Sequence, residues 1–410
     1  MSEKKDRMHL QYFFEVGVYN VNKNGKFCCG DTFMSRKMQE ENRLVCVLSD
    51  GLGSGVRANI LSTMTASMAL NFCLRNEPVV RTANIIKNTL PIDSSRNISY
   101  STFTIADVDA LTGTGKVVEY DNPPFLLIRN GKVIDVDKDL MDVDYTFTDE
   151  EHPPVGNVYI SHINFKPGDR LIMFSDGVVQ SGMGISSANM PFGWGVDGIA
   201  AYAENVIAQN PTISAQDLAH DIVTRAVFND GYKSKDDITC ACVYIRSPRR
   251  LLLCSGPPFD EAKDKYLGDV VRDFDGKKII CGGTTSKIIS RQLNEPIEVP
   301  LTNLSPDMPP ASIMKGIDLI TEGILTLGKL NELLERKGAS DIKGNKTPAH
   351  DIFNLLMQSD CIHFLIGTKI NEAHQDPSLP VELEIRRNVI KRIEKQLEEK
   401  FLKEVHVEFI

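Results

Sequence analysis

The sequence predicts an α+β sandwich followed by a second, smaller α/β domain, and three observations support this fold class. Residues 1–246 contain many short apolar runs typical of strands and only a few long helical patterns. Hairpin signals, and not regular βαβ units, connect those runs. Residues 247–410 alternate strand and helix patterns in the manner of an α/β fold. We therefore expect one domain over 1–246 and another over 247–410, with no internal repeat.

The first region begins with a strand near residue 9, after which Gly25 and Gly30 are expected to mark a hairpin. The glycine-rich turn 51–55 leads into a helix over Val56–Leu74, where apolar residues recur every fourth position. Asn130-Gly131 is a strong hairpin signal because both residues accept positive φ. Further strands are expected at 43–49, 98–108, 115–120, 125–129, 132–136, 171–174 and 238–245, and further helices at 79–90 and at 214–228 with Ser214 as N-cap.

The second region follows the connector at Pro248. Strands are expected at 251–254, 278–281, 361–366 and 405–410, and helices at 284–293, 312–335, 349–358 and 381–403. The last helix is amphipathic, and it either packs on its own domain or docks to a partner. Gly282-Gly283 lies between a strand and a helix. This turn is either a plain tight turn or an anion site, and it lacks the Gly-Lys-Ser/Thr ending of a P-loop.

Composition excludes several classes of protein. The net charge of -9 argues against a nucleic-acid partner. No run of eighteen apolar residues predicts a membrane span, and the N-terminus lacks the apolar core of a signal peptide. Nine cysteines occur without a Cys-x-x-Cys pair. We therefore expect reduced thiols, with Cys240 and Cys242 packing on one strand face, and a cytoplasmic location.

Acidic residues recur at the ends of apolar runs. Asp50 and Asp176 each follow such a run within Ser-Asp-Gly. Asp31 follows Gly30, and Asp236-Asp237 precedes the strand expected at 238–245. A lone Asp-Gly is a routine turn dipeptide, so the conjunction carries the argument. Carboxylates held at strand ends by a rigid scaffold predict a site for hard divalent cations such as Mg²⁺ or Mn²⁺.

The strings around these aspartates resemble those of the metal-dependent type-2C serine/threonine phosphatases, most nearly the branch typified by stage II sporulation protein E. The resemblance covers about residues 9–245 and rests on Gly-Asp-Thr at 30–32, Ser-Asp-Gly-Leu-Gly-Ser-Gly at 49–55, Pro-Gly-Asp-Arg-Leu-Ile-Met-Phe-Ser-Asp-Gly at 167–177 and Asp-Asp-Ile-Thr at 236–239. It implies the phosphatase α-β-β-α sandwich and a site with two ions, Mn²⁺ or Mg²⁺. The implied metal ligands are Asp31, Asp50, the Gly51 carbonyl, Asp176 and Asp236, with Asp237 as the less favoured neighbour, and the implied catalytic residues are Asp50 and Asp176.

One departure from the family pattern concerns proton donation. Many eukaryotic relatives carry Asp-Gly-His in the first motif, whereas Leu52 fills the third position here, as an apolar residue does in the sporulation branch. Protonation of the leaving oxygen would then fall to metal-bound water. A phosphomonoester dianion repels hydroxide, and its uncatalysed hydrolysis is very slow. Two metal ions would lower the pKa of a bound water molecule and hold the phosphoryl oxygens for its attack.

These features together predict a phosphoserine/phosphothreonine protein phosphatase. By resemblance, its substrate is a phosphorylated regulator of the anti-anti-sigma type in a partner-switching system. Two alternatives stay open, namely a two-metal hydrolase of a small phosphoester and a catalytically silent metal-binding scaffold. We expect no nucleic acid or membrane partner. A homodimer could form through the phosphatase helices or the C-terminal helix. For residues 247–410, regulation and substrate recruitment are the roles considered.

Overall fold

The computed structural model describes residues 12–38, 41–77, 82, 85–86, 101–141, 158–185, 190–298, 312–321, 323–336, 347–369, 381–401 and 403–410. It divides into two compact units, Met1–Ser247 and Pro248–Ile410. Each unit has its own sheet system and its own buried core. Most of the helix expected at 79–90 lies outside the described residues.

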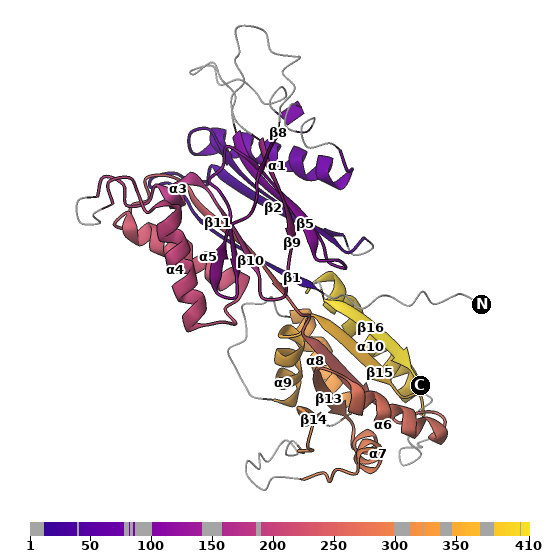
Figure 1. The fold of residues 1–410 in the computed structure, drawn as a ribbon. Coiled ribbons are helices and arrows are strands. Elements are labelled where there is room, and N and C mark those ends of the chain that lie inside the picture. Colours follow the sequence, from indigo (N-terminus) through magenta and orange to yellow (C-terminus); the bar gives the residue numbers. More distant parts are fainter. Residues whose placement is uncertain are drawn as a thin grey trace. The chain divides into compact units, whose positions relative to one another are not determined.

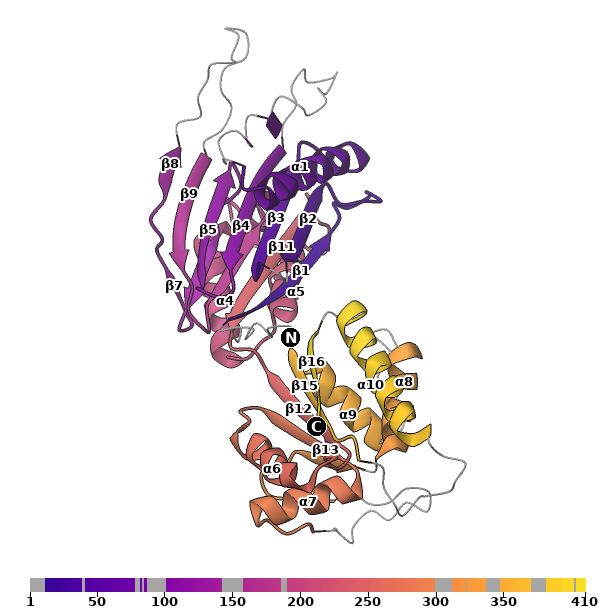
Figure 2. The ribbon, with the colours of Figure 1, turned by 90° about the vertical axis from the view of Figure 1, so that its right-hand side faces the viewer.

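Unit 1 contains two antiparallel sheets that pack face to face (Figure 1). The first has the order β1-β11-β10-β6-β7, and the second has the order β2-β3-β4-β5-β9-β8 (Figure 2). The strands are β1 (Phe13–Val21), β2 (Asp31–Met38), β3 (Arg43–Gly51), β4 (Ser101–Asp109), β5 (Thr114–Tyr120), β6 (Leu126–Arg129), β7 (Lys132–Ile134), β8 (Asp139–Met141), β9 (Val158–Asn164), β10 (Arg170–Phe174) and β11 (Ile238–Arg246).

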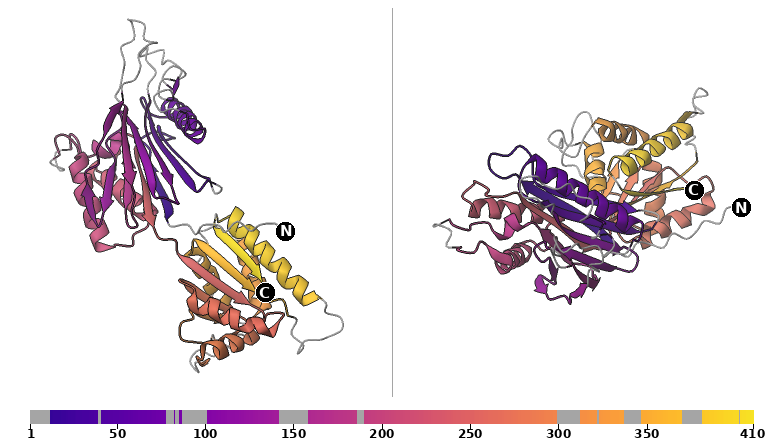
Figure 3. Two further views of the ribbon diagram at one scale, coloured as in Figure 1. Left: turned by 45° about the vertical axis from the view of Figure 1, so that its right-hand side comes forward. Right: turned by 90° about the horizontal axis from the view of Figure 1, so that it is seen from above.

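Helices cover both outer faces of this sandwich, as the left view of Figure 3 shows. Helix α1 (Val56–Leu74) packs on the second sheet, and α3 (Asp176–Val179), α4 (Gly195–Gln209) and α5 (Ala215–Asn229) lie along the first. Strand β11 is buried at all nine positions because it has a helix on one face and a sheet on the other. Unit 1 is therefore an α-β-β-α sandwich, as the sequence predicts.

Unit 2 is a doubly wound parallel sheet of order β14-β13-β12-β15-β16. Helices α6 and α7 cover one face, and α8, α9 and α10 cover the other (Figure 2). Its strands are β12 (Arg250–Ser255), β13 (Lys277–Cys281), β14 (Leu319–Thr321), β15 (Cys361–Ile366) and β16 (Glu404–Phe409). Its helices are the short 3-10 helix η1 (Glu261–Lys263), α6 (Asp264–Asp273), α7 (Gly283–Leu293), α8 (Ile324–Arg336), α9 (Pro348–Met357) and α10 (Val381–Glu399).

Several sequence predictions are confirmed at the level of single residues. Helix α1 has the predicted bounds, and the β6–β7 hairpin turns through Asn130 and Gly131 with φ of 53° and 75°. The Ser214 hydroxyl caps α5 by accepting a hydrogen bond from the Asp217 amide at 3.0 Å. Cys240 and Cys242 pack on the helix-covered face of β11.

Two predictions of local structure are wrong, and several elements were missed. The hairpin expected at Gly25–Gly30 does not form, because β1 pairs with β11 and β2 pairs with β3 in the other sheet. The helix expected over 312–335 begins only at Ile324, because residues 319–321 form the edge strand β14 beside β13. Helices α4 and α6 were not predicted. The strand β2 and the short strands β8 and β14 were also not predicted.

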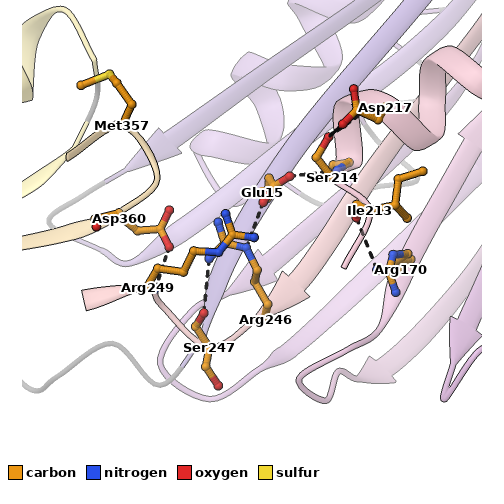
Figure 4. Close-up of polar contacts among 12 residues, drawn as sticks. Glu15, Arg170, Ile213, Ser214, Asp217, Arg246, Ser247, Arg249, Met357 and Asp360 are labelled. Atoms are coloured by element: carbon orange, nitrogen blue, oxygen red, sulfur yellow. Dashed lines mark hydrogen bonds and ion pairs between the residues drawn. The ribbon is translucent and has the colours of Figure 1, made fainter. Parts of the chain in front are cut away.

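The side chain of Glu15 joins the N-terminus of α5 to the β1–β11 strand pair (Figure 4). One carboxylate oxygen accepts from the Ala215 amide at 2.9 Å, and the other accepts from Arg246 Nε at 2.9 Å. The Arg246 guanidinium also lies 4.5 Å from the centre of the Phe13 ring. Since Glu15 and Arg246 are largely buried, the loss of Glu15 removes the carboxylate that faces the buried Arg246 guanidinium.

Replacement of Glu15 by alanine is expected to lower the free energy of unfolding of unit 1 by about 3 kcal/mol. The fluorescence of Trp194, the only tryptophan, measures unit 1 unfolding in a denaturant titration. Lys132→Ala is the matched control, because Lys132 is 76% exposed in its ion pair with Glu204 and the substitution should leave stability unchanged. Equal unfolding midpoints for Glu15→Ala and wild type would contradict the assignment.

Candidate metal centre

The five predicted aspartates all lie at one end of the sandwich. Asp31 begins β2 and stands directly opposite Asp50 of β3 in the antiparallel register. Asp176 begins α3 immediately after β10, and Asp236 and Asp237 immediately precede β11, the neighbour of β10. Four chain segments, two from each sheet, therefore bring carboxylates to the same end of the sandwich.

Electrostatic coupling shows which of these carboxylates lie close together. The pKa of Asp50 stands far above its usual range, first because the side chain is buried and then because of the charges on Asp31, Asp176 and Asp236. Burial and the charge of Asp236 also raise the pKa of Asp176. The structure thus brings four sequence-distant acids into one interacting group.

Asp31 is the member of the group whose carboxylate lacks hydrogen-bond partners on both oxygens in the described part of the chain. It is 3% exposed, and neither of its carboxylate oxygens has a hydrogen-bond partner among the described residues. Burial raises its pKa, and the nearby hydroxyls of Thr239 and Ser175 offset this only in part, without a hydrogen bond of good geometry. An ionised carboxylate buried in this way is strongly disfavoured unless a cation joins it.

The neighbouring acids Asp236 and Asp237 face different members of the group. The charge of Asp236 acts on Asp50 and Asp176, and its carboxylate forms a half-exposed ion pair with Lys23 at 3.4 Å. Asp237 is buried, accepts a hydrogen bond from the Lys23 amide at 2.9 Å, and keeps one oxygen without a partner. Its charge acts on Asp31. Both therefore belong to the cluster, but they act on different members of it.

Two glycines let the backbone of the cluster pack closely. A Cβ on Gly51 would lie 2.0 Å from the carbonyl oxygen of Ala58, so only glycine lets α1 pack against the end of β3. A Cβ on Gly177 would lie 2.1 Å from the Asp237 carbonyl oxygen, so this glycine brings α3 against the acidic pair. The glycine of each Asp-Gly pair is therefore a packing requirement. The role of the Gly51 carbonyl as a ligand stays a prediction.

Sequence reasoning missed the polar residues that hold the acids in place. The Ser101 hydroxyl donates to the Asp50 carbonyl oxygen at 2.7 Å and bonds the Ser49 hydroxyl at 2.8 Å. The Ser175 hydroxyl accepts from the Thr239 amide at 3.0 Å. Gln180 donates to the Asp176 carboxylate at 2.9 Å. The signal was present, since a serine precedes the Asp-Gly pair in both motifs and both serines are fully buried.

The donor set fits hard divalent cations. It consists of carboxylate oxygens, several of them without partners, and carboxylates are the ligands that Mg²⁺ and Mn²⁺ prefer. Within the described ranges, no three Asp, Glu, His or Cys side chains are already arranged around one ion position. Burial raises the pKa of the nearby Cys29 thiol to about 12, so this cysteine is not a thiolate nucleophile.

Comparison with known proteins places this cluster in a family context. A family model described as Stage II sporulation protein E matches residues 40–246, just over half of the chain. The phosphoserine phosphatase RsbX of Bacillus subtilis is 32% identical over 85 residues, which is 20% of this chain. The chain spans only 40% of the length of that relative.

Solved structures of the same group are also similar. The phosphatase domain of SpoIIE from Bacillus subtilis is 19% identical, with 58% of this chain and 95% of that chain covered and a TM-score of 0.42. RsbX in complex with magnesium is 18% identical, with 57% and 95% of the two chains covered and a TM-score of 0.38.

Asparagine at position 50 is expected to separate metal binding from folding. Without metal, Asp50→Asn should melt at the wild-type temperature or above it, because it removes a carboxyl whose ionised form is disfavoured by burial and by the charges of Asp31, Asp176 and Asp236. Mn²⁺ at about a hundred times its dissociation constant should raise the wild-type melting temperature by about 5 °C or more, and that of the variant by much less.

Differential scanning fluorimetry measures both effects. Asp139→Asn on β8 is the control, since Asp139 is exposed and distant in sequence from the motifs, and it should respond to Mn²⁺ like wild type. Equal stabilisation of Asp50→Asn and wild type by Mn²⁺ would rule out Asp50 as a ligand.

Proposed function

The chain belongs to the stage II sporulation protein E family, and from this premise we propose that it is a metal-dependent phosphoserine/phosphothreonine protein phosphatase. The observation that carries the proposal is the coupling of Asp31, Asp50, Asp176 and Asp236 at one sandwich edge. Two Mn²⁺ or Mg²⁺ ions bound there would supply an activated water molecule and neutralise phosphoryl charge.

The proposed metal ligands are the clustered aspartates. Asp50 and Asp176 occupy the centre of the cluster and would hold both ions, and Asp31 and Asp236 would complete the shell. Asp237 and the Gly51 carbonyl are the further ligands proposed. Leu52 packs partly into the core beneath α1, so the first motif offers no imidazole for proton donation.

The proposed substrate is a phosphorylated regulatory protein of the anti-anti-sigma type. Two findings support a phosphoprotein over a small phosphoester. The curated relative is named a phosphoserine phosphatase, and another similar structure contains the RsbU and RsbW domains of a Mycobacterium tuberculosis protein. Hydrolysis of a small phosphoester and a silent metal-binding scaffold are the competing functions.

Asp176→Asn is expected to lower kcat on a phosphoserine protein by at least about a thousandfold while substrate binding is retained, because an amide cannot hold the ions as a carboxylate does. Phosphate release in Mn²⁺ buffer measures turnover, and Asp139→Asn is the matched control with an exposed aspartate. The same assay with p-nitrophenyl phosphate and free nucleotides separates the alternatives. Faster turnover of nucleotides than of phosphoprotein would favour the small-phosphoester hydrolase, and no turnover with any substrate would favour the scaffold.

We propose that unit 2 regulates the phosphatase or recruits its phosphoprotein. The separate core of each unit supports a test by truncation, since removal of residues 250–410 leaves the core of unit 1 intact. The truncated chain should hydrolyse p-nitrophenyl phosphate at the wild-type rate but lose about tenfold or more in kcat/KM on the phosphoprotein. Unchanged kinetics on both substrates would remove this role.

Self-association and location complete the proposal. The apolar residues Ile390, Ile393 and Leu397 of α10 are buried within unit 2, whereas Val56 and Ile60 of α1 are 66% and 48% exposed. This favours the phosphatase helix over the C-terminal helix as a dimer contact. Sedimentation equilibrium tests whether the chain forms a dimer.

The described part of the chain contains no helix with the length and apolarity needed to cross a membrane. The proposed cytoplasmic location rests on the nine unpaired cysteines.

A further inference from the structure

The sheet of unit 2 has the topology of a ligand-binding fold. In its order β14-β13-β12-β15-β16 every neighbouring pair is parallel, and the chain direction across the sheet reverses between β12 and β15. In open sheets of this type, ligands bind beyond the carboxyl ends of the strands. That edge carries Gly256, Gly282-Gly283, Gly323 and Gly367, each one or two residues after a strand.

Most of this edge is filled by the chain itself. A Cβ on Gly367 would lie 2.1 Å from the Pro257 carbonyl oxygen, and a Cβ on Gly256 would lie 2.5 Å from Arg386 Nη1. The loops after β12 and β15 are thus packed against each other beneath Arg386. By contrast, Gly283 is exposed and a Cβ there would meet no atom within 4 Å. The β13–α7 turn is therefore the part of the edge with free space.

The turn presents the N-terminus of an eleven-residue helix without the usual compensation. No side chain caps α7, and neither α7 nor α8 carries an acidic residue in its first turn. Gly282 has φ of 120° and donates its amide to the carbonyl oxygen of Thr321, the last residue of β14, at 2.9 Å. A Cβ on Gly282 would lie 3.8 Å from the Cα of Gly323, the residue before α8. The positive ends of two helix dipoles therefore meet at this point.

Two buried hydroxyls without partners point to a ligand independently of the helix ends. Thr285 of α7 is 1% exposed, and its hydroxyl lies 3.5 Å from the position a Gly282 side chain would take. Thr326 is the third residue of α8, as Thr285 is of α7, and is 7% exposed. No hydrogen bond joins either hydroxyl to a described residue, and neither oxygen is wholly closed to solvent. Each is therefore available to donate to a ligand that enters the turn.

We propose that the β13–α7 turn binds the phosphate group of a small phosphorylated molecule. A phosphate offers several acceptor oxygens, which match the first amides of α7 and the Thr285 and Thr326 hydroxyls. The dipoles of α7 and α8 compensate its negative charge. The turn differs from a P-loop because Lys287, the first lysine of α7, comes after Thr285-Ser286, and not before a Ser or Thr.

Calorimetric titration of the full chain with inorganic phosphate and with adenosine 5′-monophosphate tests the site. A chelator in the buffer keeps metal from the aspartate cluster of unit 1, so phosphate binding there is suppressed. Gly283→Asp and Gly283→Ala form the matched pair, because both fit the open space at this position. The alanine variant should bind like wild type. The aspartate variant should bind at least about tenfold more weakly, because its carboxylate repels the phosphate.

Stability separates loss of binding from misfolding. An aspartate in the first turn favours the helix, so Gly283→Asp should melt no lower than Gly283→Ala. Thr285→Val, which keeps the side-chain shape but removes the hydroxyl, should weaken binding several-fold. Absence of binding by both probes at up to about 10 mM would overturn the proposal. Equal affinity of the aspartate and alanine variants would also overturn it, since the bound phosphate would then lie elsewhere.

Discussion

Mutual repulsion among buried carboxylates is the constraint on which the rest of unit 1 depends. Burial and the charges of Asp31, Asp176 and Asp236 raise the pKa of Asp50, and Asp31 has no hydrogen-bond partner for either oxygen among the described residues. Such a group costs folding energy in the absence of cations. One apolar core lies between the two sheets, and a further core lies between each sheet and the helices that cover it. Burial of these side chains offsets the unfavourable energy of the acidic cluster. The acidic cluster is therefore locally unfavourable, and a bound cation would compensate its negative charge.

The strand register makes this conflict rigid. The Asp31–Asp50 pairing is fixed because a shift of one residue in β3 would turn its buried positions, Val45 to Leu48, to the opposite faces. Helix packing on Gly51 and the approach of Gly177 to Asp237 fix the backbone on either side. The acids cannot separate without unpacking the core, so their separation in space is set by the same contacts that hold the sandwich together.

Much of this was predictable from the sequence because its signals are local. The positive φ of Asn130-Gly131 and the Ser214 cap depend on adjacent residues, and both were predicted at the correct position. The hairpin predicted at Gly25–Gly30 is wrong because β1 pairs with β11, more than 200 residues later in the chain. Local sequence signals do not reveal a pairing over that distance. The edge strand β14 was hidden for a similar reason. Its three residues become a strand through pairing with β13, and not through any periodicity of their own.

The candidate site divides in the same way. The aspartates were found because each adjoins an apolar run, and the clustering followed from the idea that strand ends meet at sheet edges. The partners that orient them, Ser101 and Gln180, have no such pattern, because their contact with Asp50 and Asp176 exists only after folding or on a helix turn as short as α3. Which of Asp236 and Asp237 serves as a metal ligand also depends on side-chain direction, which sequence order does not specify.

Each unit contains a group of polar atoms without hydrogen-bond partners among the described residues, acceptors in unit 1 and donors in unit 2. In unit 1, acceptors are gathered without enough donors, so Asp31 and Asp237 keep oxygens that a cation can use. In unit 2, donors are gathered without acceptors, since the α7 terminus lacks a cap and the Thr285 hydroxyl lacks a partner. In each case glycine permits the close approach of backbone that creates the imbalance. At these two places the unpaired acceptors of unit 1 favour a cation, and the unpaired donors of unit 2 favour an anion.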